Sequence, residues 1–388
     1  MVCIDAFSRA YISKEYTPFL SGLASRGVAT SLSPLFAFRG IETTMFTGVW
    51  PEVHGIWTEN CLRPTNSSAF SSLSELLVRS LDLLGSDKVR KLGRVAMQCL
   101  RDRTSTRLTP NLIPAEAFGY FEPSQKKAIF EQGAAGSTPT LFDVLRNNKL
   151  DFAFIEPPFI GGDKGVVDRV DSLCKSHKDI KFWYLKFGSP DKAGHNNGPI
   201  PDKIKSTLRQ IDKYLEQVIR ILQKRFGDLD IMIMADHGMS RVDSYFDMLQ
   251  DLRALNSDMY KDYVLFLDST MARFWFFNDR ARSEIEGYLM KLRHGWVLSD
   301  QEFKDLHIPL DRRYGECIFV MDEGKMIYPD FWSGSRKAKG MHGYAIPKSN
   351  EAIPILILNK EISQYCKKNK AFTYVDIFSI LQQSLFTT

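Results

Sequence analysis

Aspartate and histidine residues occur in three short groups, far apart in the sequence, each beside an apolar run or a glycine turn. The groups are Asp191 with His195, Asp236 with His237, and His342 before Gly343. With Asp5, which follows the apolar run 2–4, they supply six side chains of the kind that bind zinc-like ions. Two such ions, ~3.5–4 Å apart, can hold the attacking and leaving oxygens of a phosphoryl displacement. The set therefore predicts a metal-dependent hydrolase of phosphate or related esters.

The elements that must position these side chains are strands alternating with helices. Apolar strands are predicted over 152–155, 180–187 and 229–235, and helices over 139–146, 166–174 and 202–224. This rhythm is typical of an α/β fold with a parallel sheet and helices on both faces. Asp5, Asp191 and Asp236 each follow a strand closely, so we expect them to meet at the carboxyl edge of the sheet. Asp191 and His195 are expected in a glycine-containing loop.

Two segments interrupt this rhythm and define the expected domain organisation. Residues 62–135 have helical spacing at Leu73, Leu76, Leu77 and Leu81, which predicts a helical insertion. Residues 245–335 contain predicted strands at 264–267, 272–277 and 317–321 with a helix over 282–292, which predicts a small α+β cap. The metal-binding core would then comprise residues 1–61, 136–244 and 336–388, ending in a strand at 353–358 and a helix at 375–385.

Composition restricts the classes of partner and compartment. The 388 residues are 44% hydrophobic, ample for a large core, and the net charge of +5 suits an anionic substrate without indicating nucleic acid. Six scattered cysteines without CxxC spacing predict reduced thiols. With no apparent signal peptide and no apolar run of membrane-spanning length, a cytoplasmic location is expected. The abrupt start, with Asp5 after four residues, is also what an N-terminally shortened sequence would show.

The order of the motifs resembles the alkaline phosphatase superfamily, and most of all its nucleotide pyrophosphatase/phosphodiesterase branch. The resemblance covers nearly the whole chain and rests on Asp5, Thr47-Gly48 with Pro51-Glu52-Val53-His54-Gly55, Pro190-Asp191 with His195, Asp236-His237-Gly238-Met239, and Gly340-Met341-His342-Gly343-Tyr344. It implies an alkaline phosphatase-like fold and hydrolysis of phosphodiesters or phosphomonoesters. It also implies two divalent ions, zinc or else manganese. Asp191, His195 and His342 would hold one, and Asp5, Asp236 and His237 the other. His54 is expected to be structural.

The chain departs from the family pattern at the nucleophile. The family places a threonine or serine about ten residues before Gly48, where this chain has Phe38 and then Arg39. Thr43 and Thr44 are candidates, although they lie one or two helical turns too late. A phosphate-binding asparagine is expected at position 59, which is Glu59, so Asn60 is the candidate one residue later.

Arg39 allows two interpretations. Its guanidinium could bind a phosphate or sulfate through two parallel hydrogen bonds. Alternatively, it pairs with Glu42 or Asp236 and fills the space.

Three functions are compatible with these residues. The first is hydrolysis, in which a metal-activated water attacks directly or Thr43 or Thr44 attacks covalently. The second is a related phosphoryl or sulfuryl transfer or a mutase reaction. The third is a catalytically inactive member of the family that binds metal and an anionic ligand. The expected partner is a phosphate- or sulfate-containing small molecule or glycoconjugate, with no nucleic acid and no membrane span indicated.

Overall fold

The computed structural model describes residues 1–64, 80, 86–101, 111–158, 160–176, 179–334, 336–365 and 371–386. The four leucines that suggested a helical insertion lie outside these ranges. Within them, no helix combines the length and the apolar character needed to cross a bilayer.

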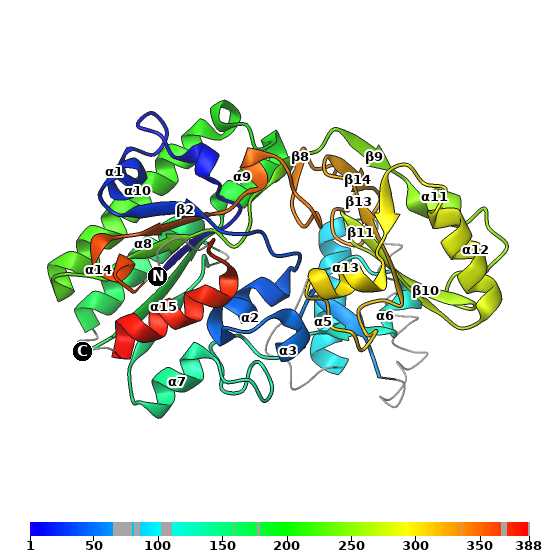
Figure 1. Cartoon of the computed structure of the whole chain (residues 1–388), viewed down its shortest axis with the longest axis horizontal. Coiled ribbons are helices and arrows are strands. Elements are labelled where there is room, and N and C mark those ends of the chain that lie inside the picture. Colours follow the sequence, from blue (N-terminus) through cyan, green and yellow to red (C-terminus); the bar gives the residue numbers. More distant parts are fainter. Residues whose placement is uncertain are drawn as a thin grey trace.

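A six-stranded sheet forms the centre of the larger lobe (Figure 1). Its strands, in spatial order, are β2 (Val28–Ser31), β16 (Ile355–Leu358), β7 (Met232–Met234), β1 (Val2–Ile4), β6 (Phe182–Phe187) and β5 (Phe152–Ile155). Strands β5, β6, β1 and β7 are parallel, as predicted, whereas β16 is antiparallel to both of its neighbours. The α/β class is confirmed, and the sheet is mixed. The direction of β16 follows from where the chain enters the sheet. Residues 341–352 lie at the carboxyl edge of the parallel strands, so β16 begins at that edge and runs in the opposite direction.

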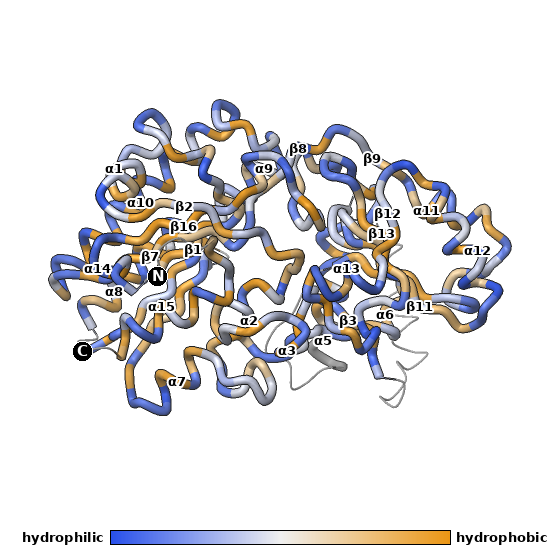
Figure 2. Tube along the Cα trace, in the orientation of Figure 1, coloured by the Kyte–Doolittle hydropathy of each residue, from blue (hydrophilic) through white to orange (hydrophobic). Residues whose placement is uncertain are grey.

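Strand alternation divides the core between two helical layers. On one face, Ile4, Leu185 and Ile233 pack with α1 (Pro18–Arg26), α8 (Gly162–Ser176) and α10 (Pro201–Phe226). On the other, Cys3, Tyr184 and Met234 pack with α2 (Arg39–Thr47), α7 (Leu141–Asn147) and α15 (Tyr374–Phe386). Figure 2 shows the strands as hydrophobic segments between helices of mixed hydropathy. The prediction of helices on both faces is confirmed.

The beginning of α7 differs from the prediction. The helix predicted over 139–146 would have Thr138 as its N-cap, but α7 begins at Leu141 and Thr140 is its N-cap. The Thr140 hydroxyl accepts from the Asp143 N–H, and the Asp143 carboxylate accepts from the Thr140 N–H. This reciprocal pair requires an acidic residue three positions after the cap, which Thr140 has and Thr138 lacks.

A second, antiparallel sheet forms the smaller lobe. Its order is β10 (Tyr263–Leu267), β11 (Met271–Phe276), β13 (Cys317–Met321) and β12 (Gly295–Val297). Helices α11 (Met248–Leu252), α12 (Asp279–Leu289) and α13 (Asp300–Asp305) accompany it. Its core also contains residues of α6 (Ala115–Phe118) and β4 (Phe121–Pro123). The described end of segment 62–135 therefore packs with this lobe.

Two pairs of short strands and further helices complete the two lobes. β4 pairs with β3 (Asn60–Leu62), and β9 (Ser244–Phe246) pairs with β14 (Lys325–Ile327). Further helices are α3 (Pro51–His54), α5 (Asp87–Arg101), α14 (Lys360–Ser363) and the 3-10 turns η1 (Arg9–Tyr11) and η2 (Asn350–Ala352).

Candidate metal centre

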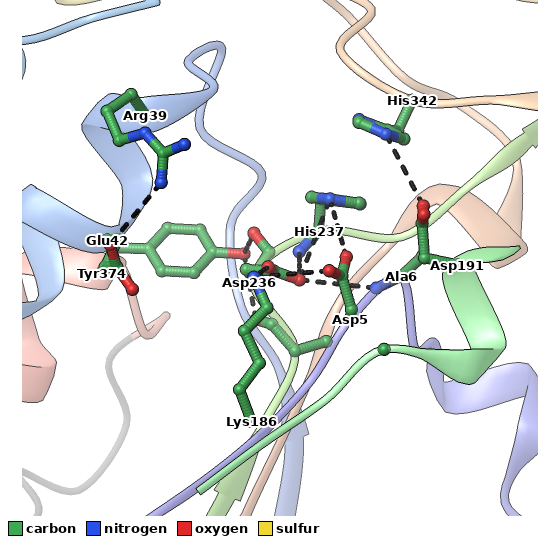
Figure 3. A network of polar contacts seen from close by, with 12 residues as sticks. Asp5, Ala6, Arg39, Glu42, Lys186, Asp191, Asp236, His237, His342 and Tyr374 are labelled. Atoms are coloured by element: carbon green, nitrogen blue, oxygen red, sulfur yellow. Dashed lines mark hydrogen bonds and ion pairs between the residues drawn. The ribbon is translucent and has the colours of Figure 1, made fainter. Parts of the chain in front are cut away.

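All six predicted ligands meet at the carboxyl edge of the central sheet. Figure 3 labels each of them except His195. One group contains Asp191, His195 and His342, and the other contains Asp5, Asp236 and His237. Within each group the ligand atoms lie within 4.8 Å of one another. The rings of His237 and His342 stack with centroids 3.8 Å apart, so the two groups adjoin. The structure thus brings together the residues that the sequence singled out, in the same two sets.

Asp191 and His195 lie on a helix, α9 (Ser189–Asn197), and the expected loop is wrong. Pro190 favours the first turn, and the buried Asp163 carboxylate accepts from the N–H groups of Gly188 and Ser189. The spacing of four residues then places both ligands on one face of the helix. Gly194 allows the helix to pack closely against Met239, because a Cβ at this position would lie 2.3 Å from the Met239 sulfur.

His342 is positioned by a short strand beside the end of β7. Residues Gly340–Met341 form β15, which pairs antiparallel with β8 (Ser240–Arg241). Because β8 follows Asp236 and His237 closely in the chain, this pairing brings His342 against them. Glu323 holds the same region from the smaller lobe, since its carboxylate accepts from the hydroxyls of Ser240 (2.5 Å) and Ser349 (2.6 Å).

The first group has the donor set that a zinc-like ion requires. Nδ1 of His195 lies 2.8 Å from the carbonyl oxygen of Gly340, which orients Nε2 towards Asp191. Asp191 Oδ1 is buried, accepts no hydrogen bond from any described residue, and lies 3.2 Å from His195 Nε2 and 3.6 Å from His342 Nε2. Burial, together with the neighbouring histidines, lowers the pKa of His342 well below its usual value, so this ring is neutral, as a ligand must be. An ion between these three atoms would satisfy all of them.

The second group includes a side chain that sequence analysis overlooked, Lys186. Its ammonium lies 3.0 Å from Asp236 Oδ2 and 3.3 Å from Asp5 Oδ2 (Figure 3). Burial opposes its charge, yet the carboxylates of Asp236 and Asp5 raise the pKa of Lys186 well above its usual value. The clue in the sequence is a single charged residue inside the otherwise apolar strand Phe182–Phe187.

The proton on His237 is also held by this group. Burial opposes protonation, but Asp236 and Asp5 raise the pKa of His237 to about 10. An ion bound here would have to displace that proton. Asp5 Oδ1 lies 3.2 Å from His237 Nε2, and Asp236 Oδ1 accepts from the backbone N–H groups of Ala6 and His237.

The N-terminus of α2 carries Phe38 and Arg39 where a nucleophile was expected. Phe38 is the N-cap residue and lies close to His342, with ring centroids 6.0 Å apart. Arg39 Nε donates to Glu59 Oε2 at 2.8 Å, and its Nη1 lies 3.8 Å from Glu42 Oε2. Pairing with Glu42 was one of the two interpretations of Arg39; Glu59 is a partner that the sequence did not reveal.

The hydroxyl and amide candidates lie away from the metal groups. Thr43 and Thr44 are fully buried in α2, where Thr43 Oγ1 lies 3.5 Å from the Arg39 carbonyl and Thr44 Oγ1 3.0 Å from His54 Nε2. Asn60 is buried in β3, and its backbone carbonyl accepts from Arg273. None of the three lines the cavities beside the metal groups, whereas Glu59 lines both.

His54 stabilises this part of the fold as a neutral ring. Its Nδ1 accepts from the Ile56 N–H, so its Nε2 donates to Thr44. Burial lowers the pKa of His54 from 6.5 to about 3. Between these two values the unfolded chain binds a proton that the folded chain does not, so the free energy of unfolding falls as the pH falls.

We expect a His54→Gln variant to show a weaker acid dependence of stability. Between pH ~6.5 and ~5.5 the unchanged chain should lose about 1 kcal/mol more than the variant. Urea unfolding at both pH values measures the difference. Equal losses in the two proteins would show that His54 is not a buried neutral group.

Besides a small pocket of about 30 Å³ lined by Asp236, His237 and His342, two cavities adjoin the metal groups. The smaller, of about 210 Å³, is lined by five carboxyl groups but only two cationic side chains besides the histidines: Asp5, Glu42, Glu59, Asp191 and Asp236 against Arg39 and Lys186. The larger, of about 400 Å³, lies between the lobes and is lined by His195 and His342 with Lys91, Asp268 and Trp332. An anion can occupy the smaller cavity only if further positive charge is supplied.

Gly238 fixes the backbone next to His237. A Cβ there would lie 2.3 Å from the carbonyl carbon of Ala352 and 2.4 Å from the carbonyl oxygen of Glu351. That oxygen already accepts from the Met239 N–H at 2.8 Å, so the backbone has little room to move. Gly238→Ala is expected to lower the free energy of unfolding by ~1–3 kcal/mol.

The matched control is Gly287→Ala in α12, where an added Cβ meets nothing within 4 Å. That change should be neutral or stabilise by up to ~1 kcal/mol. Denaturant unfolding of both variants compares them. Equal stabilities would show that the packing around Gly238 is looser than described.

Known proteins of one family resemble this chain in sequence. The family model described as type I phosphodiesterase / nucleotide pyrophosphatase matches residues 1–345. Ectonucleotide pyrophosphatase/phosphodiesterase family member 7 of Mus musculus is 23% identical over 269 residues, which are 68% of this chain and 54% of the relative. A Caenorhabditis elegans ectonucleotide pyrophosphatase/phosphodiesterase is 22% identical over 359 residues, covering 89% of this chain and 37% of the relative. The chain thus spans about half the length, or less, of these curated relatives.

Solved structures share the fold over almost the whole chain. Human ectonucleotide pyrophosphatase/phosphodiesterase 5 superposes with a TM-score of 0.70 at 18% identity, covering 99% of this chain and 93% of that one. The murine protein of the same name, an inactive variant in complex with AMP, superposes with a TM-score of 0.68 at 16% identity, covering 99% and 93%.

Proposed function

Since this chain belongs to the type I phosphodiesterase/nucleotide pyrophosphatase family of the alkaline phosphatase superfamily, we propose that it is a metal-dependent hydrolase of phosphodiesters or phosphomonoesters. One observation carries the proposal: six aspartate and histidine side chains from four separate segments converge at one edge of the sheet. Structural stability alone does not require such a set, because clustered carboxylates without a cation repel one another.

The charges of the site support the need for metal. Five carboxyl groups against Arg39, Lys186 and a protonated His237 leave an excess of acidic groups that disfavours a phosphate anion. Zinc, or else manganese, suits the mixed oxygen and nitrogen ligands Asp191, His195 and His342. When bound, such an ion supplies Lewis acidity towards phosphate oxygens and acidifies water.

Water is the proposed attacking group. Among the described residues that line the smaller cavity there is no serine, threonine or cysteine. Glu42 lines it, and burial, with Glu156 nearby, raises the pKa of Glu42 to about 7. A carboxyl group with that pKa is suited to take a proton from water near neutral pH.

The proposed ligand is an anionic, nucleotide-like phosphate ester. AMP in the complex of the murine relative favours this class. The larger cavity would hold the remainder of the ligand beyond the phosphate, with Trp332 and Lys91 in its wall. Sulfate esters and glycoconjugates are further candidates, expected from the sequence.

A second function is favoured by one observation, the position of Phe38. A phenylalanine at the N-terminus of α2, close to His342, offers no nucleophile. The chain would then be a catalytically inactive member that binds metal and an anionic ligand.

Hydrolysis of bis-p-nitrophenyl phosphate and p-nitrophenyl phosphate, after loading with zinc or manganese, distinguishes the two functions. Asp236→Asn and His342→Ala are the test variants. Turnover that both substitutions abolish would support the hydrolase. Metal binding without turnover would support the inactive member, and turnover unchanged in both variants would contradict the assigned site.

A further inference from the structure

The two metal groups differ in the partners that the protein already provides for their carboxylate oxygens. In the first group, Asp191 Oδ1 is buried and faces two histidine rings, at 3.2 and 3.6 Å, but no lysine and no backbone N–H donor among the described residues. In the second, every carboxylate oxygen has a partner. Asp5 Oδ1 faces His237 Nε2 at 3.2 Å, and Asp236 Oδ1 accepts two backbone N–H groups. The remaining two oxygens, Asp5 Oδ2 and Asp236 Oδ2, face the Lys186 ammonium at 3.3 and 3.0 Å.

We propose that Lys186 is a built-in cation that takes the place of the second metal ion, so that the chain binds a single divalent ion, at Asp191, His195 and His342. This inference rests on the metal dependence in the proposed function and concerns how many ions the site holds. It differs from the expectation of two ions that the resemblance implied.

The position of Lys186 makes it a fixed part of the second group. It is in β6, where it is paired in register with Cys3 of the adjacent strand β1, two residues before Asp5. The strand alternates, so Lys186 shares a face with Tyr184, and both line the smaller cavity together with Glu42 and Met45 of α2. The ammonium therefore reaches the two carboxylates from the cavity side.

Because both are positively charged, the Lys186 ammonium and a divalent ion are not expected to occupy the second group together. A metal ion bound to Asp5, Asp236 and His237 would lie within a few ångströms of the ammonium, and the repulsion between them is poorly screened in a partly buried site. One ammonium shared by two carboxylates neutralises much of the negative charge that would attract a metal ion. The second ion should therefore bind at least ~100-fold more weakly than it would without Lys186.

The count of bound ions tests the inference. The purified 388-residue chain is incubated with excess zinc, desalted and measured by elemental analysis against protein concentration. We expect about one ion per chain for the unchanged protein and about two for Lys186→Met, which removes the ammonium and keeps the stem. Lys192→Met is the matched control, because Lys192 is exposed on α9 beside Asp191. It should leave the count at about one.

A second variant tests the inference even if Lys186→Met fails to fold. Asp5→Asn disables the second group only, so it should keep its one ion, with thermal unfolding as the check on folding. Two ions in the unchanged chain, one ion in folded Lys186→Met, or loss of the ion in Asp5→Asn would each overturn the proposal. A count of two would leave the hydrolase proposal standing, whereas a count of zero would refute the metal dependence as well.

Discussion

Substituting asparagine for Asp191 is expected to abolish the stabilisation that zinc gives to this chain. Asp191 Oδ1 lies between His195 Nε2 and His342 Nε2, and asparagine keeps its shape but removes its charge. The metal affinity should fall at least ~100-fold, beyond the effect of changing an outer-sphere partner. Zinc at about 100 times its Kd should add about 2.7 kcal/mol to the free energy of unfolding of the unchanged chain, and close to nothing to the variant.

Thermal and urea unfolding with and without zinc measure this effect independently of catalysis. Asp168→Asn is the control, because Asp168 is an exposed carboxylate of α8 that pairs with Lys164 at the surface. It should respond to zinc like the unchanged chain. Full zinc stabilisation in Asp191→Asn would refute the assignment of this group as the metal site.

Replacing Arg273 by methionine is expected to destabilise the chain by ~3–5 kcal/mol. Arg273 is fully buried in β11 and donates from Nε to Asp268 Oδ2 at 2.9 Å. Its Nη1 donates to the carbonyl of Asn60 at 2.9 Å, which fixes β3 next to Glu59. Burial raises the pKa of Asp268, and Arg273 opposes that rise, so removing the arginine leaves a buried carboxylate without its cation.

The double variant Arg273→Met with Asp268→Leu should recover much of this loss, because no uncompensated charge remains. Arg280→Met is the surface control: Arg280 pairs with Asp262 at 3.2 Å but is largely exposed, so the change should cost less than ~1 kcal/mol. Urea unfolding compares all three. Equal losses for Arg273→Met and Arg280→Met would show that the buried pair contributes no more than a surface pair.

The six candidate ligands were predictable because each of their positions has a local cause. Asp5 and Asp236 directly follow apolar strands, and parallel strands carry such residues to one edge. The amphipathic pattern of residues 202–224 likewise predicted α10, whose buried face recurs every three or four residues.

Features that depend on contacts between distant segments were not predictable in this way. The spacing of Asp191 and His195 fits a loop as well as a helix, until Asp163 caps α9 and Gly194 packs against Met239. In the sequence, Glu59 was noted only because it occupies the position of the expected asparagine. Its side chain reaches the site because it pairs with Arg39 and directly precedes β3.

The sequence by itself determined the α/β class, the parallel strands and the six candidate ligands near strand ends and turns, because strand periodicity and strand-end polarity are local properties. Only the tertiary structure decided the direction of β16, because an apolar run does not indicate whether its strand is parallel or antiparallel to its neighbours. It also decided the partners of Lys186, because a lysine in a strand has no charge partner until strands β1 and β7 bring Asp5 and Asp236 beside it.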